Sequence, residues 1–95
     1  MTMIDEVTAG SAQLLDVRTA EEWQEAHAEH AIHIPISELL HGETGSLVPT
    51  KKVYIYCASG ARANAATGLL QQRGFEAVCV GGLRDWLAAG GAEAK

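Results

Sequence analysis

The chain has 95 residues, the length of one small domain; 47% of them are hydrophobic and 20% are charged. Twelve acidic residues against seven lysines and arginines give a formal net charge of −5. This balance argues against nucleic acid and anionic membranes as partners, since both bind clustered positive charge. The charge is also uneven, because residues 1–45 carry nine acids and only Arg18, whereas residues 46–95 carry six bases and three acids. We therefore expect chemistry on anions in the second half.

Further classes are excluded by what the sequence lacks. No apolar run approaches the roughly 20 residues of a membrane helix. Residues 1–6 lack the basic and apolar regions of a signal peptide, so a cytoplasmic location is expected; a periplasmic protein whose leader has been removed would have the same sequence. Two cysteines, Cys57 and Cys79, are too few for a disulfide scaffold and form no C-x-x-C motif.

The first half of the chain predicts short elements. Thr19 and Glu22 have the spacing of a capping box, which begins a helix that carries Trp23 inward. Pro35 ends a strand, because proline cannot extend a central ladder. The remaining expectations are a short strand and a helical turn over 4–9, strands over 13–17 and 31–34, a helical turn over 37–41 and an irregular connection over 42–50.

The second half gives sharper signals. It predicts a strand over 53–56, a tight segment over 57–62, a helix over 63–73, a strand over 76–80 that Gly81 and Gly82 break, and a helix over 83–89 before a frayed tail. Trp23 and Trp86 are expected to plug the faces of the sheet. Alternating strands and helices predict an α/β fold. We expect one domain over 1–95, with a central, mostly parallel sheet of four to five short strands and helices on both faces.

Cys57 is the main candidate for catalysis. It ends a predicted strand, and ligands of parallel sheets bind beyond the carboxyl ends of the strands. The next helix directs its positive N-terminus at the same point, and Arg62 adds a guanidinium. Gly60 supplies the freedom for positive φ that so tight a loop requires. The loop amides form a cradle that favours the nucleophilic thiolate; they belong to Ala58, Ser59, Gly60, Ala61 and Arg62.

Other residues have a structural interpretation beside the functional one. A cysteine after an apolar strand can be a small buried hydrophobe, but the strand, loop and helix around Cys57 favour a reactive thiol. Asp16 and Arg18 end a strand on the same side of the sheet; an ion pair that holds the turn is favoured over a role in tuning Cys57. Cys79 is expected to be inert core, with a resolving disulfide to Cys57 as the alternative.

Polar clusters elsewhere predict no further site. Four histidines lack carboxylate or cysteine companions at a metal-binding spacing, so no metal site is expected; they are His27, His30, His33 and His41. A histidine base acting on Cys57 is not expected either, because a preformed thiolate does not need one. Four acidic residues are interpreted as a solvated helix face, with repulsion of acidic donors or docking of a basic carrier protein as the alternatives; they are Glu21, Glu22, Glu25 and Glu29.

Several motifs in fixed order resemble the single-domain rhodaneses, a family of thiosulfate and related sulfurtransferases. The resemblance covers about residues 14–86. Its motifs are Leu14-Leu15-Asp16-Val17-Arg18, Glu22-Trp23 followed by His27, Ile34-Pro35 followed by Glu38-Leu39, Tyr56-Cys57-Ala58-Ser59-Gly60-Ala61-Arg62, Gly74-Phe75, and Gly81-Gly82 with Trp86. The chain departs from the family pattern at four points: Ala63 in place of a serine, Ala61 without a charged or polar group in the loop, a short segment before Leu14, and residues 26–31 in place of the usual G-H-I-P-G-A.

The resemblance implies a sulfurtransferase without a cofactor. Cys57 would take sulfur from a small anionic donor such as thiosulfate and carry it as a persulfide, with Arg62 and the loop amides assisting. The acceptor would be cyanide, or a thiol such as glutathione, thioredoxin or another protein. Two alternatives stay open. One is a sulfur carrier that a partner protein loads; the other is a dual-specificity phosphatase or arsenate reductase, whose related loops are one residue longer.

Overall fold

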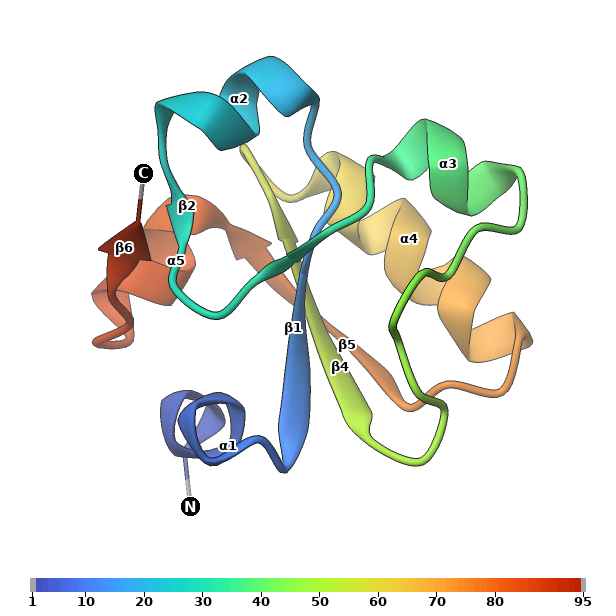
Figure 1. Ribbon diagram of the computed structural model, residues 1–95, viewed down its shortest axis with the longest axis horizontal. Coiled ribbons are helices and arrows are strands. Elements are labelled where there is room, and N and C mark those ends of the chain that lie inside the picture. The colour runs from blue at the N-terminus through green and yellow to red at the C-terminus, as the bar shows by residue number, and fades with distance from the viewer. Residues whose placement is uncertain (1, 95) are drawn as a thin grey trace.

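Strands and helices alternate along the chain in the computed structural model, which describes residues 2–94 (Figure 1). Met1 and Lys95, which the expected domain over 1–95 includes, lie outside the described residues. In chain order the elements are α1 (Met3–Ala9), β1 (Ala12–Asp16), α2 (Ala20–Glu25), β2 (His27–Ala28), β3 (Ile32–His33), α3 (Ile36–Leu40), β4 (Lys52–Cys57), α4 (Ala61–Gln72), β5 (Ala77–Gly82), α5 (Leu83–Ala88) and β6 (Glu93–Ala94).

Four strands form a parallel sheet in the order β3-β1-β4-β5, as the alternation of elements predicts. The central strands β1 and β4 are in a register that pairs Leu15 with Ile55 and Asp16 with Tyr56. Because all four strands run in one direction, their carboxyl ends meet at one end of the sheet. That end carries Asp16 and Cys57, the last residues of β1 and β4.

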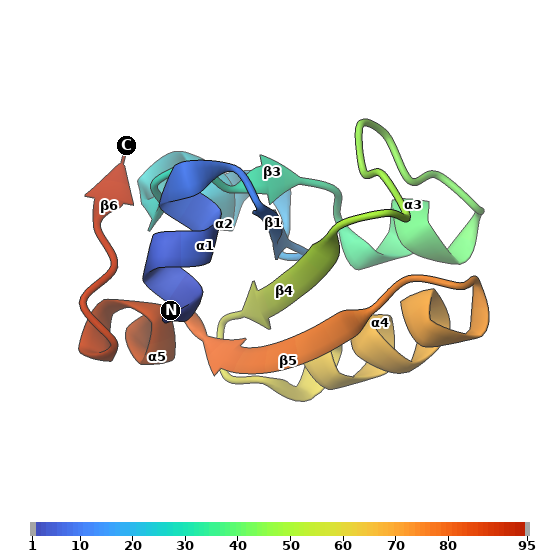
Figure 2. The same cartoon turned by 90° about the horizontal axis from the view of Figure 1, so that it is seen from below.

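Each face of the sheet has its own buried cluster, because side chains alternate along the strands. Val53, Ile55 and Cys57 of β4 pack with α3 and α4, whereas Tyr54 and Tyr56 pack with α1 and α5. Figures 1 and 2 show these helix pairs on opposite sides of the sheet. The prediction of helices on both faces is therefore confirmed, and Cys57 points to the side of α4.

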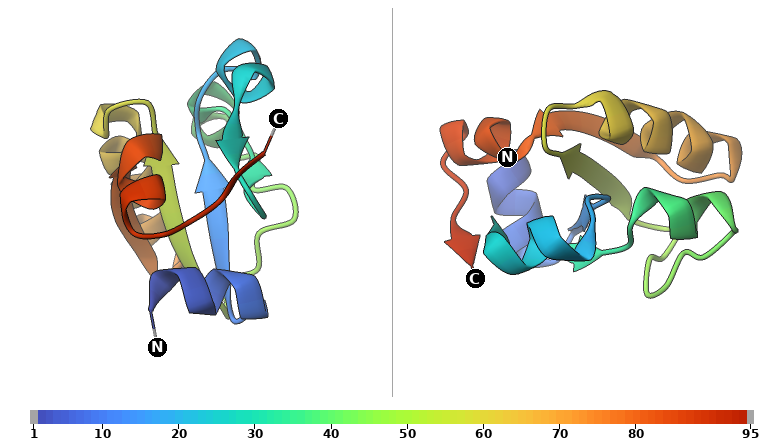
Figure 3. Two further views of the ribbon diagram at one scale, coloured as in Figure 1. Left: turned by 90° about the vertical axis from the view of Figure 1, so that its left-hand side faces the viewer. Right: turned by 90° about the horizontal axis from the view of Figure 1, so that it is seen from above.

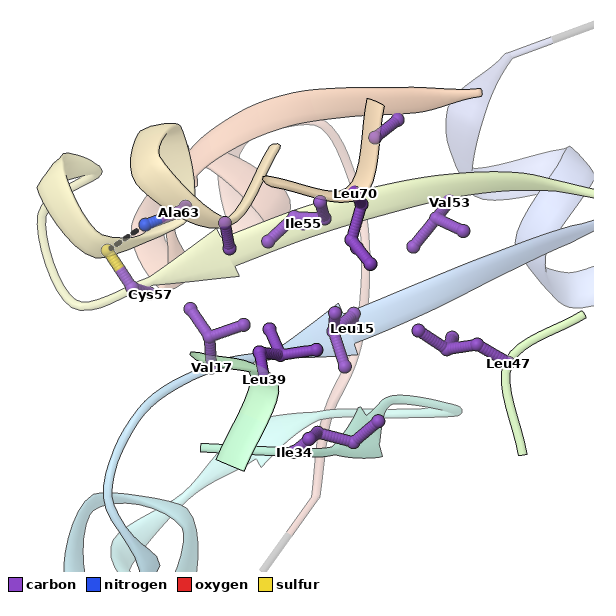
Figure 4. Close-up of a cluster of buried hydrophobic side chains, with 12 residues drawn as sticks. Leu15, Val17, Ile34, Leu39, Leu47, Val53, Ile55, Cys57, Ala63 and Leu70 are labelled. Atoms are coloured by element: carbon purple, nitrogen blue, oxygen red, sulfur yellow. Dashed lines mark hydrogen bonds between the residues drawn. The ribbon is translucent and has the colours of Figure 1, made fainter. Parts of the chain in front are cut away.

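The helix α4 lies close to the sheet because its inner positions carry small side chains. Ala63 and Ala66 are fully buried, and Leu70 completes the contact with β4 (Figure 4). On the other face Trp86 of α5 is 1% exposed, as expected of a residue that plugs the sheet. Of the helices in residues 2–94, none is long and apolar enough to cross a membrane.

Residues 4–9 belong to the helix α1, so the strand predicted there is wrong. Thr2 and Asp5 form a capping box, in which Thr2 Oγ1 accepts from the Asp5 amide at 3.2 Å and Asp5 Oδ2 from the Thr2 amide at 3.4 Å. Gly10 ends the helix with φ of +81°. Val7 belongs to the buried cluster that contains Tyr54 and Tyr56. The buried apolar face and the caps at both ends therefore stabilise a helix over these residues.

β5 is an edge strand, and this corrects two expectations. Cys79 is exposed rather than core, and its neighbour Val78 is 38% exposed. An edge position leaves apolar side chains incompletely covered, which a run of hydrophobic letters does not reveal. The strand also continues through Gly81 and Gly82, where a break was predicted, and Gly82 pairs with Cys57.

The segment after Gly91 is paired and not frayed. β6 forms a two-stranded antiparallel sheet with β2, in which Ala94 lies opposite His27 (Figure 3). The carbonyl of Ala92 accepts from the Glu29 amide at 2.8 Å and from the Trp86 indole nitrogen at 3.0 Å. These contacts hold the C-terminal segment against β2 and α5.

The departure over residues 26–31 has a conformational consequence. His30 has φ of +72° and is the one non-glycine residue in the left-handed region among the described residues. The family pattern places glycine at this position, where glycine has no steric cost. The connection into β3 therefore holds a side-chain-bearing residue in a conformation that costs free energy.

Candidate functional site

Cys57 ends β4, and its Sγ faces the first turn of α4 (Figure 4). The sulfur accepts hydrogen bonds from the backbone amides of Gly60 at 3.0 Å and Ala63 at 3.4 Å. Gly60 is the N-cap residue of α4 and has no side chain to satisfy these amides. Sγ therefore acts as the capping acceptor at the positive end of a 12-residue helix, where negative charge on sulfur is stabilised.

Two glycines allow the loop over 57–62 to fold above the sulfur. Gly60 has the positive φ that the sequence predicts, at +113°. A Cβ at Gly82 would lie 2.4 Å from the carbonyl oxygen of Ala58, so this position of β5 has no room for a side chain. The loop thus packs directly on the backbone of the neighbouring strand.

Among residues 2–94, two backbone amides donate to Sγ itself, those of Gly60 and Ala63. The cradle of loop amides expected around a bound anion stays a prediction. Ala58, Ser59 and Ala61 are exposed, and Ser59 makes no bond to the sulfur. Ala63 was missed because the prediction stopped at residue 62. The third residue of a helix nevertheless has a free amide, which was an available signal.

Arg62 is engaged by Glu22. Its Nη1 and Nη2 donate to Glu22 Oε1 and Oε2 at 2.8 and 3.1 Å. These hydrogen bonds lower the pKa of Glu22 to about 2, and Glu22 in turn raises the pKa of Arg62. The interpretation of the acidic helix face as solvated holds for the exposed Glu21 and Glu25 but not for Glu22. Glu29 is exposed as expected, but it lies in the turn after β2 and not on the helix.

Asp16 and Arg18 form a buried ion pair, with exposed fractions of 0% and 6%. Arg18 Nε and Nη2 donate to Asp16 Oδ2 at 3.0 and 2.9 Å, and the Arg18 amide donates to Oδ1 at 2.8 Å. Tyr56, which lies opposite Asp16 in the register, donates its hydroxyl to Oδ2 at 2.6 Å. This network lies on the opposite face of the sheet from the Cys57 side chain. It holds Tyr56, the residue before Cys57, in place.

The comparisons with known proteins agree with this geometry. The sequence-family model of the rhodanese-like domain matches residues 2–89 of this chain. The chain belongs to the rhodanese-like family. A solved rhodanese-related protein from Thermoplasma volcanium shares the fold with a TM-score of 0.78 and 34% identity, over 92% of this chain and 87% of that one.

Two curated relatives of this rhodanese-like domain have names that refer to sulfur. A candidate sulfur carrier protein, YrkF, of Bacillus subtilis (strain 168) is 37% identical over 80% of this chain and 42% of its own length. The thiosulfate sulfurtransferase PspE of Escherichia coli (strain K12) is 35% identical over 75% of this chain and 70% of its own length. The chain thus spans less than half of the first relative.

Two of the four histidines of the rhodanese-like domain stack on Trp23. The ring centroids of His27 and His33 lie 3.5 and 4.8 Å from that of Trp23. The imidazoles also bond to backbone carbonyls, His27 Nδ1 to Trp23 and His33 Nε2 to Arg18, each at 2.8 Å. Trp23 is thus half-buried among imidazoles at the end of α2 and belongs to neither buried cluster, so the prediction that it plugs a face of the sheet is wrong. Within residues 2–94, no group of three or more potential ligands is placed to hold a metal.

The Tyr56 hydroxyl gives the rhodanese-like domain a testable response to alkali. Burial and the hydrogen bond to Asp16 raise the pKa of Tyr56 above its usual 10.0. A raised pKa contributes stability that is present below the unfolded value and lost as pH rises beyond it. We expect the free energy of unfolding to fall above about pH 10, and to fall less steeply in Tyr56→Phe. Chemical denaturation at several pH values measures both slopes; equal slopes would contradict the assignment.

Proposed function

We propose that this domain is a sulfurtransferase in which Cys57 carries a sulfane sulfur as a persulfide. The observation that carries the proposal is the position of Sγ, which accepts hydrogen bonds from two backbone amides at the N-terminus of α4. Donors fixed in this way stabilise charge on sulfur without reorganising during the reaction. The resemblance of the chain to a thiosulfate sulfurtransferase supports the same chemistry.

In the first step the Cys57 thiolate attacks the outer sulfur of thiosulfate. A bond forms between Sγ and that sulfur, while the sulfur–sulfur bond of the donor breaks and its electron pair leaves with sulfite. The negative charge of the thiolate then resides on the terminal sulfur of the persulfide. The amides of Gly60 and Ala63, which bond to Sγ in the free protein, are fixed donors beside the persulfide.

In the second step a thiophilic acceptor attacks the terminal sulfur. Cyanide takes the sulfur as thiocyanate, and the electron pair of the persulfide bond returns to Sγ as the thiolate. A thiol such as glutathione or thioredoxin, once deprotonated, takes it as a persulfide of its own. Both steps transfer one sulfur atom, so no external oxidant or reductant is needed.

Turnover of thiosulfate and cyanide tests the proposal. We expect saturable formation of thiocyanate by the unaltered protein and a loss of at least 1,000-fold, on the order of a removed nucleophile, in Cys57→Ser. Cys79→Ser is the matched control, because Cys79 is also free but lies exposed on β5. Thiocyanate formation by Cys57→Ser at the unaltered rate would refute the assignment.

A sulfur carrier is the second candidate, and the likeness to the candidate carrier YrkF favours it. A carrier uses the same Cys57 persulfide but receives sulfur from a partner protein and not from thiosulfate. Adding a cysteine desulfurase and cysteine separates the two. A carrier is loaded only in that mixture, whereas a thiosulfate sulfurtransferase is loaded by thiosulfate alone.

A further inference from the structure

The Arg62 guanidinium, the cation nearest the proposed persulfide loop, already has a carboxylate partner. Both Glu22 oxygens accept from it, and the two side chains are 31% and 34% exposed. Arg62 also senses negative charge at Cys57, which contributes to the raised pKa of the guanidinium. Glu22 therefore lies within the electrostatic reach of a charged molecule at the sulfur.

The Glu22 carboxylate is fixed where it stands. As the third residue of α2 it closes the capping box, so its Oε1 accepts from the amide and hydroxyl of Thr19 at 3.0 and 3.2 Å. The same Oε1 accepts from Arg62. Moving Glu22 away from Arg62 would break the helix cap as well as the ion pair, so an incoming anion meets both groups together.

The two arginines that follow β1 and β4 at this end of the sheet are each paired with a carboxylate. Arg18 is paired with the buried Asp16, as Arg62 is with Glu22. Arg84, in the first turn of α5, is exposed. The N-terminus of α4 and its amides also attract a negative donor, with a field equivalent to about half a charge.

We propose that Glu22 selects sulfur donors by charge, disfavouring the thiosulfate dianion relative to a singly charged thiosulfonate. The proposal rests on the function assigned to Cys57 above. A thiosulfonate presents the same sulfur–sulfur bond and releases a sulfinate in place of sulfite, so the bond that forms at Sγ is identical. The two donors differ chiefly by one negative charge, which is the quantity that Glu22 senses.

Coulomb's law makes the expected effect specific. Repulsion by Glu22 scales with the charge of the donor, so removing it favours a dianion twice as much, in free energy, as a monoanion. The rate constant for thiosulfate should therefore rise by about the square of the factor for the thiosulfonate. At effective dielectric constants between about 20 and 80 we expect roughly tenfold and threefold increases.

The test compares loading of Cys57 by thiosulfate and by methanethiosulfonate in Glu22→Gln. Glutamine serves in a capping box, so α2 keeps its cap while the charge is lost. Glu25→Gln, on the exposed side of the same helix, is the matched control and should change both rates little. Second-order rate constants are read from the gain of one sulfur by the protein at about 10 mM and about 1 M salt, since high salt screens the effect.

The expected result is a ratio of thiosulfate to methanethiosulfonate rate constants about threefold higher in Glu22→Gln than in the unaltered protein at low salt, and unchanged at high salt. An unchanged ratio with both donors active would overturn the selection by charge and leave the Cys57 chemistry standing. An equal change in Glu25→Gln would also overturn it. If neither donor loads the unaltered protein or any variant, the proposed function is overturned, and this inference with it.

Discussion

Replacing Asp16 with leucine should lower the free energy of unfolding by about 3–5 kcal/mol, the usual result of leaving a buried charge without its partner. Asp16 is fully buried and accepts from the Arg18 guanidinium, the Arg18 amide and the Tyr56 hydroxyl. A domain has only about 5–15 kcal/mol of total stability, so the variant should unfold at much lower urea concentration. Urea denaturation followed by tryptophan fluorescence measures the difference.

The double variant Asp16→Leu with Arg18→Met separates two effects on stability. One is the cost of leaving a buried charge unpaired, and the other is the cost of altered side-chain packing. With both charges gone, no buried charge is left unpaired, so the double variant should lose less stability than the two single variants summed. Glu43→Ala, at an exposed acid, should stay within about 0.5 kcal/mol of the unaltered protein. A loss of less than about 1 kcal/mol in Asp16→Leu would contradict the importance of the pair.

Replacing Gly82 with alanine should cost about 100-fold or more in sulfur transfer, the order of effect of displacing a reacting group by about 1 Å. The added Cβ would lie 2.4 Å from the Ala58 carbonyl oxygen, which belongs to the backbone and has no free rotamer with which to yield. The loop must therefore move, and with it the Gly60 amide that bonds to Sγ. Overpacking should also lower the free energy of unfolding by about 1–3 kcal/mol.

Gly68→Ala is the matched control for Gly82→Ala. Gly68 lies inside α4, where an added Cβ meets nothing within 4 Å. Alanine there should raise the free energy of unfolding by roughly 0.5–1 kcal/mol, because it removes the conformational entropy of glycine, and should leave transfer unchanged. If Gly82→Ala transfers sulfur as fast as Gly68→Ala, the close packing of loop and strand does not hold the site.

The sequence was sufficient for the architecture because the second half follows strong local rules. The apolar strand before Cys57 and the small residues of α4 each determine their own element, and the parallel sheet follows from their alternation. The position of Cys57 at a strand end could be predicted for the same reason. The bond from Gly60 to the sulfur also follows from the turn that this glycine permits.

The errors concern properties that depend on neighbours far along the chain. Cys79 has an apolar context, but only the strand order reveals that β5 is an edge strand. The tail after Gly91 has no strand pattern of its own and is ordered by pairing with β2. Glu22 was assigned to a solvated face because the local sequence shows only its role in the capping box. Its contact with Arg62 joins residues 40 positions apart. One error is local, because only a helical turn was predicted within α1 and the start of the helix was interpreted as a strand, although Thr2 and Asp5 carry a capping signal.

The proposed persulfide is tested most directly by the intact mass of the protein after incubation with thiosulfate, without reductant. The Cys57 assignment predicts a gain of one sulfur atom, reversed by cyanide, in the unaltered protein and in Cys79→Ser. Cys57→Ser should gain nothing. The comparison is decisive because Cys79 is the more exposed of the two thiols and would react first in a non-specific process. The account would be contradicted if Cys57→Ser gained a sulfur atom and Cys79→Ser did not.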